Sequence, residues 1–208
     1  MSPSVTEKQK IITDKKILDA AQSLFSKKGF KETSMDEIVK KSGLSKGAIY
    51  GHFRNKEQLI LAIHKRQTEL VLNQLNLTFS ENLSTIEKLR RVGELIFTNT
   101  YCCPKEFQRS NIEFFIEASR KKPLAQGFNK RYKTIEGFIK KILQEGVLKG
   151  EFRKSLDSAT LSALLFVTID GLTLHWSTMG VDFNWNHIKK VLLNTVLDGI
   201  VEVKNDVV

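Results

Sequence analysis

The sequence has few of the residues that define special classes of protein. Its 208 residues include two cysteines, three prolines and twelve glycines. Cys102 and Cys103 are adjacent, and neighbouring cysteines rarely pair, so no disulfide scaffold is expected and a reducing compartment is favoured. The low proline and glycine content argues against collagen-like and linker-rich chains. Thirteen phenylalanines supply apolar bulk for a core, which argues against disorder.

The chain also lacks a long uninterrupted hydrophobic run. Residues 1–16 are polar and mixed in charge, without the apolar segment that a signal peptide needs. The longest weakly polar stretch, 158–179, is interrupted by Asp170 and His175, whereas a membrane-spanning helix takes ~20 predominantly apolar residues. We therefore expect a buried helix over 158–179, a cytoplasmic protein and no membrane partner.

Motifs for enzymatic chemistry are missing as well. The sequence contains no glycine-rich phosphate loop, no nucleophile elbow and no dinucleotide fingerprint. Its four histidines do not stand at metal-ligand spacing, and Cys102-Cys103 lacks the two-residue spacing of a zinc knuckle. The sequence thus predicts neither an enzyme nor a bound metal or cofactor. The adjacent thiols are interpreted as residues near a helix end rather than as a sensor of oxidants or soft metals.

Basic residues are in excess. Lysine and arginine number 33 against 23 aspartates and glutamates, which gives a net charge of +10. Residues 1–70 carry 14 of these basic residues and 8 of the acidic ones, so more than half of the excess lies in the first third. Such a charge favours a polyanionic partner, either nucleic acid or an acidic membrane surface, although a merely solubilising surface has the same composition.

Helical periodicity runs through nearly the whole chain. Helices are expected over about 14–28, 35–43, 46–53, 56–77, 85–101, 104–122, 124–148, 158–179 and 185–203. Capping boxes begin helices after Ser34 and Ser84, while Gly29 and Gly43 stand where helices end. No run alternates apolar and polar residues as a strand would. The sequence predicts an all-α fold of about nine helices.

Residues 34–53 give a helix, a glycine-centred turn and a second helix. This is the pattern of a helix-turn-helix motif, whose second helix enters the major groove of DNA. Ile49 and Phe53 would anchor that helix to a three-helix core. The residues then expected at the DNA are the small Gly47, Ala48 and Gly51 and the polar Lys46, Tyr50, His52 and Lys56. The small residues would let the backbone approach the groove floor, and the polar ones would reach phosphates or base edges.

Residues 29–59, GFKETSMDEIVKKSGLSKGAIYGHFRNKEQL, resemble the signature of the tetracycline-repressor-like (TetR) family of bacterial regulators. The resemblance extends without a gap from Ile17 to about Ile63. It implies an all-α homodimer with an N-terminal DNA-binding domain and a C-terminal domain that dimerises and binds a small molecule. Most members repress transcription and leave DNA when that ligand binds.

The resemblance also implies roles for individual residues. It assigns phosphate contacts to Thr33 and Ser45, a position in the groove to Lys46, Gly47, Ala48, Tyr50 and Gly51, and backbone contacts to His52 and Lys56. Gly51 departs from the family, which often places a larger or aromatic residue there. Base reading at this point would then be weaker, or would rely on close approach of the backbone.

The segments 158–179 and 185–203 are apolar around much of their circumference, which predicts burial on more than one side. We expect both helices to pair with their symmetry mates in a two-fold, four-helix dimer interface. Two recognition helices would then match half-sites ~34–36 Å apart on a palindromic operator. The expected interface residues are Leu165, Leu172, Trp176, Ile188, Leu192 and Val196.

Aromatic residues are frequent in the second part of the chain and predict an apolar pocket for a hydrophobic effector of unknown identity. The expected lining residues are Phe97, Tyr101, Asn111, Phe115, Phe128, Tyr132, Phe166 and Asp170. For any single aromatic residue, ordinary core packing is favoured over a role in the pocket. Asp170 stands within an apolar run, where a buried carboxylate must be paired. A partner at the dimer interface or a helix end is favoured over a cationic ligand.

The sequence therefore predicts a DNA-binding transcriptional regulator, with a helix-turn-helix domain in residues 1–60 and a ligand-binding and dimerisation domain in residues 61–208. The favoured hypothesis is a repressor that a small-molecule effector releases from double-stranded DNA. The alternative is a structural or accessory DNA-binding factor of the same fold that acts without an inducer. Nonspecific membrane binding is a weaker third hypothesis, because Gly43 and its flanking caps indicate an ordered turn.

Overall fold

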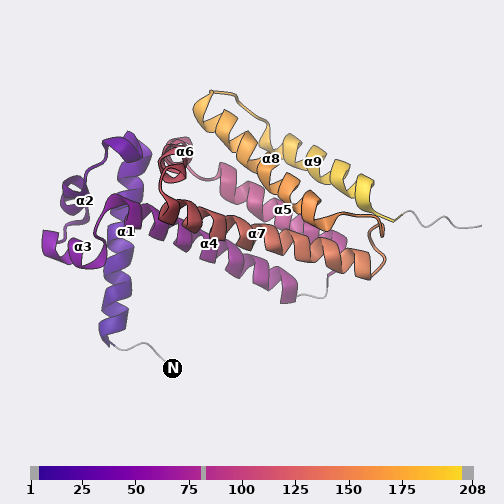
Figure 1. The fold of residues 1–208 in the computed structure, drawn as a ribbon, viewed down its shortest axis with the longest axis horizontal. Coiled ribbons are helices and arrows are strands. Elements are labelled where there is room, and N and C mark those ends of the chain that lie inside the picture. The colour runs from indigo at the N-terminus through magenta and orange to yellow at the C-terminus, as the bar shows by residue number, and fades with distance from the viewer. Residues whose placement is uncertain (1–4, 81–82, 203–208) are drawn as a thin grey trace, which may run out of the picture. The chain divides into compact units, whose positions relative to one another are not determined.

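The computed structural model describes residues 5–80 and 83–202, and within these ranges the chain is all-α (Figure 1). The helices are α1 (Val5–Glu32), α2 (Met35–Ser42), α3 (Lys46–His52), α4 (Lys56–Ser80), α5 (Thr85–Tyr101), α6 (Lys105–Ser119), α7 (Lys122–Leu148), α8 (Ser158–Thr178) and α9 (Trp185–Ile200). The only strand-like pairing in the described ranges is an isolated bridge between Phe152 and Val201. The predicted all-α fold of about nine helices is confirmed.

Local capping chemistry explains where several helices begin and end. The Ser34 hydroxyl accepts a hydrogen bond from the Glu37 N–H at 3.2 Å, and the Glu37 carboxylate accepts one from the Ser34 N–H at 2.9 Å. Ser84 and Glu87 form the same capping box at 3.2 and 3.0 Å. Gly43 ends α2 with a φ of 68°, a left-handed conformation that glycine adopts without strain.

The N-terminal helix departs from the prediction. α1 begins at Val5 rather than near Asp14, because Lys, Glu and Gln favour a helix even where no apolar stripe signals one. Near its other end, Gly29 interrupts α1 with φ and ψ of 84° and 167°. Only glycine readily adopts this region of backbone conformation, so the last turn of α1 points in a new direction.

The chain forms two compact units. Unit 1 comprises Met1–Gln67 and Pro104–Phe128, and unit 2 comprises Thr68–Cys103 and Asn129–Val208. Helix α6 therefore packs with the N-terminal helices, although it lies far from them in the sequence. α4 and α7 each contribute to both units.

Unit 1 is built around α1, which packs against α2 and α6. Its fully buried apolar side chains are Ile17, Ala21, Phe25, Ile38, Ile49, Leu59, Ile60, Ile63, Phe107 and Phe114. The Phe30 ring lies 5.4 Å from that of Phe25 and 4.8 Å from that of Phe114, between centroids. Apolar residues of α1, α2, α3, α4 and α6 thus share one core, which fixes α3 at the surface.

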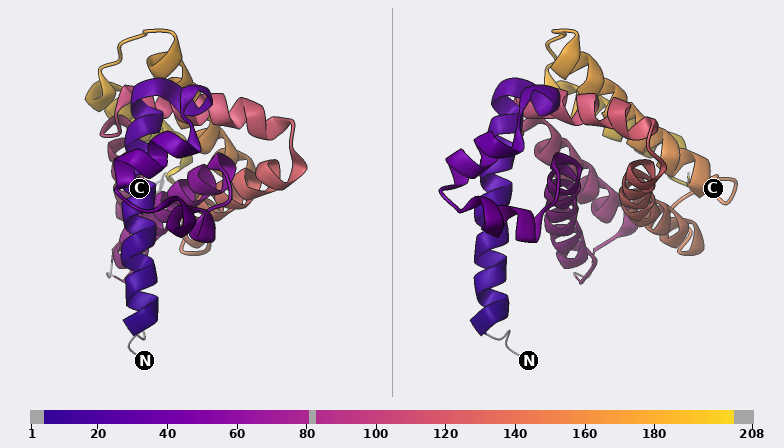
Figure 2. Two further views of the ribbon diagram at one scale, coloured as in Figure 1. Left: turned by 90° about the vertical axis from the view of Figure 1, so that its left-hand side faces the viewer. Right: turned by 60° about the vertical axis from the view of Figure 1, so that its left-hand side comes forward.

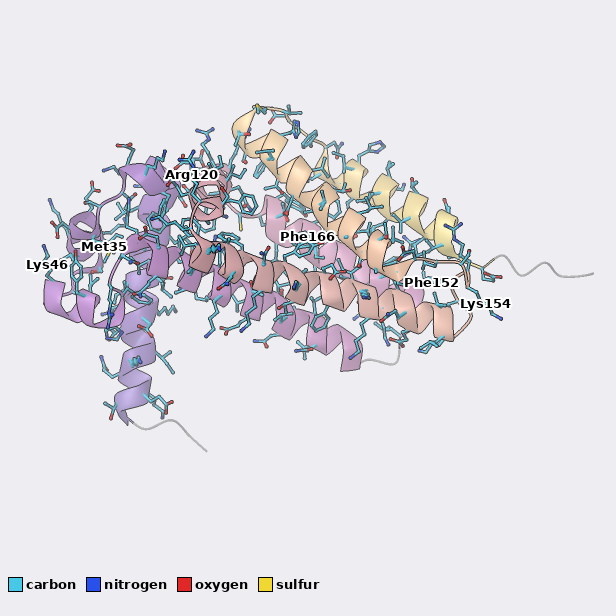
Figure 3. The ribbon with its side chains drawn as sticks, viewed as in Figure 1. Met35, Lys46, Arg120, Phe152, Lys154 and Phe166 are labelled. Atoms are coloured by element: carbon cyan, nitrogen blue, oxygen red, sulfur yellow. The ribbon has the colours of Figure 1, made fainter. Side chains whose placement is uncertain are left out.

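Unit 2 is built around α5, which packs against α8 and α9. Gly93 of α5 permits this packing, because a Cβ there would come within 2.6 Å of the Leu193 side chain. Phe152, labelled in Figure 3, is fully buried and lies over Gly146. A Cβ on Gly146 would lie 2.1 Å from the Phe152 ring, so both glycines are required for close packing.

Helix α8 is only partly buried in the single chain. Leu164 and Val167 are each 58% exposed, and only Ser158, Ser162 and Ser177 of this helix are buried. By length and composition alone, α8 is the one helix of the described residues that could cross a membrane. In the single chain one side of the helix is uncovered, and its predicted burial against a partner subunit stays a prediction. A helix that is apolar all round needs both of its sides covered. The pattern does not show whether a single chain covers both sides.

Candidate nucleic-acid interface

Helix α3 presents a short exposed face on a buried anchor. The Ser45 hydroxyl caps the helix by accepting a hydrogen bond from the Ala48 N–H at 3.1 Å. Ile49 is fully buried and holds the seven-residue helix against the core. A Cβ added to Gly47 or Gly51 would meet no atom within 4 Å. The backbone at both glycines is therefore open to a close partner.

Two polar side chains of α3 lie beside this open backbone. The Lys46 Nζ lies 2.8 Å from a carboxylate oxygen of Asp36 on α2 and 5.8 Å from the centroid of the Tyr50 ring. The hydrogen bond to Asp36 raises the pKa of Lys46, so its ammonium stays charged. Tyr50 is 39% exposed. Figure 3 shows Lys46 at the start of α3.

Besides Ser45 and Lys46, three of the predicted DNA contacts have partners within the protein, beginning with Thr33 and Lys56. Thr33 is buried, and its hydroxyl donates to the Gly29 carbonyl at 2.8 Å. The Lys56 ammonium donates to the carbonyls of Phe30 and Lys31 at 2.8 and 2.9 Å and lies 4.9 Å from the Phe30 ring centroid. Burial lowers the pKa of Lys56. Lys56 thus caps the end of α1, and the DNA contacts of both residues stay predictions.

The third engaged residue is His52, the last residue of α3. Its Nδ1 lies 2.6 Å from a carboxylate oxygen of Asp14 on α1. The two residues are 38 positions apart, so helical periodicity gave no sign of this contact. It joins the end of the recognition helix to the first turns of α1.

Helix α6 is joined to the break in α1 by its acidic side chains. Glu113 accepts a hydrogen bond from the Phe30 N–H at 3.0 Å, and Glu117 lies 3.2 Å from the Lys31 ammonium. A Cβ on Gly29 would lie 2.8 Å from a Glu113 oxygen. No sequence pattern indicates these contacts, because the partners come from distant helices.

The residues predicted to line an effector pocket are divided between the units. Unit 1 contains Asn111, Phe115 and Phe128, and unit 2 contains Phe97, Tyr101, Tyr132, Phe166 and Asp170. Within the units, the Phe115 and Phe128 rings lie 5.5 Å apart and the Tyr132 and Phe166 rings 4.8 Å apart, both nearly perpendicular. Asp170 is exposed rather than buried as expected. The pocket itself stays a prediction.

Unit 2 has two further features relevant to a ligand. Trp185 lies at the centre of an aromatic cluster with Phe97, Tyr101, Trp176 and Phe183, at centroid distances of 5.5 to 6.4 Å. A groove of about 630 Å³ between the end of α7 and the start of α8 is lined by Lys140, Gln144, Val147, Leu148, Leu156, Asp157, Ser158 and Ala159. None of the predicted lining residues borders this groove.

The six residues predicted at a dimer interface, Leu165, Leu172, Trp176, Ile188, Leu192 and Val196, are all partly buried in the single chain. Leu165 and Val196 pack against the core of unit 2. More exposed apolar positions on the same helices are Leu164, Val167 and Val191, the last at 48%. The sequence pattern missed them because a helix that is apolar all round does not show which side faces inward.

Known proteins resemble this chain in sequence and in fold. Residues 17–63 match the family model of bacterial regulatory proteins, tetR family, and residues 101–201 match the tetracyclin repressor-like C-terminal domain. The HTH-type transcriptional regulator UidR of Escherichia coli K12 is 32% identical over 155 residues, covering 74% of this chain and 76% of UidR. The HTH-type transcriptional regulator QacR of Staphylococcus aureus is 34% identical over 137 residues, covering 66% and 72%.

Among solved structures, the transcriptional regulator FadR from Bacillus subtilis in complex with stearoyl-CoA superposes with a TM-score of 0.72 at 24% identity. The match covers 89% of this chain and 98% of FadR. At this identity the likeness concerns the fold. The two family matches and the relatives above 30% identity lead to one conclusion: the chain belongs to the tetR family of bacterial regulatory proteins.

Proposed function

We propose that the protein is a homodimeric transcriptional repressor that binds a palindromic operator through α3 and leaves it when a small hydrophobic or aromatic effector binds. The observation that carries the proposal is the open face of α3. Gly47 and Gly51 leave its backbone uncovered, and Lys46 and Tyr50 border it, above the buried anchor Ile49. Residues 1–60 would bind DNA, and residues 61–208 would bind the effector and dimerise.

The face of α3 suits the major groove. Backbone at a glycine can approach base edges that a side chain would block, and the methyl group of Ala48 suits a thymine methyl. Lys46 and Tyr50 would supply polar contacts to bases or phosphates. Ser45, Thr33, His52 and Lys56 would chiefly position this face through their hydrogen bonds within the protein. Lys46 also pairs with Asp36, but both side chains are exposed, so this ion pair could give way to DNA.

Dimerisation would bring two such faces to one operator. The outward side of α8 carries Leu164 and Val167, each 58% exposed, and α9 carries Val191, 48% exposed. Exposed apolar side chains of this kind favour a partner of equal apolarity. A second copy of the chain provides one by two-fold symmetry.

The effector is proposed to be hydrophobic, in keeping with the aromatic residues of the second domain. FadR, which has the same fold, was solved with stearoyl-CoA, so long-chain acyl-CoA is a suitable first probe. Release requires that the effector bind the DNA-free state more tightly, since a ligand shifts an equilibrium only by its differential affinity. The cytoplasm, where DNA and acyl-CoA are both present, is the proposed location.

The test is fluorescence anisotropy with a duplex from upstream of the gene for this chain. We expect Lys46→Ala and Tyr50→Ala to weaken binding, whereas Lys141→Ala, which removes an exposed lysine of unit 2, should leave it unchanged. Equal losses in Lys46→Ala and Lys141→Ala would contradict the assignment of α3. Stearoyl-CoA should lower the anisotropy of the complex. If no effector releases DNA that is bound specifically, the same fold acts as an accessory factor without an inducer.

A further inference from the structure

The first three turns of α1 lie outside both the family match and the core. The match begins at Ile17, and Ile17 is also the first buried side chain among the described residues. Helix α1 nevertheless starts at Val5. Figures 1 and 2 show that this N-terminal part of α1 extends past α2 and α3 within unit 1. We call residues 5–16 the α1 extension.

The α1 extension contacts α3 through Asp14 and His52. Asp14 of the extension and His52 at the end of α3 are joined at 2.6 Å. The extension therefore leaves the domain directly beside the last turn of α3. Its direction relative to α3 is fixed by this contact and by the buried Ile17 and Leu18 that follow.

The helical phase of α1 shows which residue of the extension continues on the α3 side. At 3.6 residues per turn, Lys10 lies about 40° from Asp14 around the helix and ~6 Å further along it. Lys16 lies about 160° from Asp14, on the opposite face. Lys10 is thus one turn beyond the contact with α3, on the same side of the helix.

Charge and exposure in the extension favour a polyanionic partner. It carries four lysines, Lys8, Lys10, Lys15 and Lys16, against Glu7 and Asp14. All four lysines are exposed. In the described ranges, neither Lys10 nor Lys16 forms an ion pair with another residue. Next to Lys10, Ile11 is 57% exposed, which leaves an apolar surface that a deoxyribose could cover.

We propose that the α1 extension is a second DNA-contacting element, in which Lys10 binds a backbone phosphate that flanks the bases beneath α3. The proposal rests on the proposed function, because it takes α3 to lie in the major groove. Lysine is a compact point charge that binds phosphate without reading sequence. Lys10 would therefore add affinity to every duplex and no discrimination between duplexes.

The experiment compares Lys10→Gln with Lys16→Gln in the full chain. The two variants remove the same charge from the same exposed helix, on opposite faces. Binding to the upstream duplex and to a scrambled duplex is measured by anisotropy across a salt series. Each phosphate contact releases about 0.9 counterion, which corresponds to about fivefold in affinity at 0.15 M salt. Far-UV circular dichroism and the thermal midpoint show that the variants are folded.

We expect Lys10→Gln to weaken binding to both duplexes by about fivefold per contact, or about 25-fold for a dimer, and to reduce the salt slope by about 0.9 per contact. Lys16→Gln should bind as the wild type does, and Lys10→Arg should retain affinity. Equal behaviour of Lys10→Gln and Lys16→Gln, whether both unchanged or both weakened, would overturn the proposal. If the wild type binds both duplexes alike, the proposed function fails, while the comparison of the two variants still decides the role of Lys10.

Discussion

The carboxylate of Glu113 accepts a hydrogen bond from the backbone N–H of Phe30 at 3.0 Å. The break at Gly29, where φ is 84°, takes Phe30 out of the regular helix, so the Phe30 N–H is available to Glu113. The Glu113 carboxylate packs so closely on Gly29 that a Cβ there would lie 2.8 Å from one of its oxygens. Helix α6 thereby holds the turn that leads into α2 and the DNA-binding face.

Replacing Gly29 by alanine should destabilise unit 1. The substitution forces a side chain into a glycine-only conformation, at a cost of ~1–3 kcal/mol, and brings its Cβ against Glu113. Urea unfolding followed by circular dichroism measures the change. Gly137→Ala in α7 is the matched control, since a Cβ there meets no atom within 4 Å and alanine favours a helix interior. A Gly29→Ala protein as stable as the wild type would refute the role of the break.

The capping box of α2 should make stability depend on pH in the acid range. The pKa of Glu37 is lowered from 4.5 to about 2, mainly by a hydrogen bond from Lys28 and to a smaller extent by hydrogen bonds from Ser34. Because the folded pKa is the lower one, the stabilisation is fully present above the unfolded pKa of 4.5 and is lost as pH falls toward 2. Urea midpoints of the wild type and Glu37→Gln should therefore converge between pH 5 and pH 2. A constant difference across this range would contradict the assignment.

The contact between Asp14 and His52 should support DNA binding by orienting α3. Asp14→Ala removes the partner of His52, and we expect operator affinity to fall by about fivefold, equivalent to a hydrogen bond of ~1 kcal/mol. Asp19→Ala removes the same charge from α1, where Asp19 pairs with Arg66 at 2.7 Å, and serves as the control. Anisotropy measures both variants. A loss of affinity no greater in Asp14→Ala than in Asp19→Ala would show that the contact does not orient α3.

The exposed apolar side of α8 should mediate dimerisation. Val167→Glu places a charge on this side, and its burial against a second copy would leave it unpaired, so we expect a shift toward monomer. Sedimentation velocity at micromolar concentration gives the oligomeric state. Leu148→Glu is the control, because Leu148 is 88% exposed and lies on α7. A wild type that is already monomeric, or a Val167→Glu protein that remains dimeric, would contradict this interface.

The features that the sequence predicted correctly depend on neighbours in the chain. Two capping boxes each lie within one turn, formed by Ser34 with Glu37 and by Ser84 with Glu87. Such a motif can be recognised in the sequence. The glycine at position 43 ends α2 for a reason that is equally local. The nine helices of the described residues and the location of α3 follow from such signals together with apolar periodicity.

The features that the sequence did not predict depend on residues far apart in the chain. The bonds of Lys56 to the end of α1 and of His52 to Asp14 join separate helices, and no periodic pattern encodes them. The early start of α1 at Val5 has no apolar stripe to mark it. The exposure of Leu164 depends on which side of α8 meets the core, which an apolar helix does not specify.

The central claim is that the open face of α3 reads a DNA sequence. The most direct test is the ratio of wild-type affinities for the upstream duplex and for a scrambled duplex, measured by anisotropy at physiological salt. We predict a ratio of ~10³ or more, as expected for specific recognition, which persists as the salt concentration rises. Equal affinities that fall together steeply with salt would show binding by charge alone and would contradict the claim for this DNA.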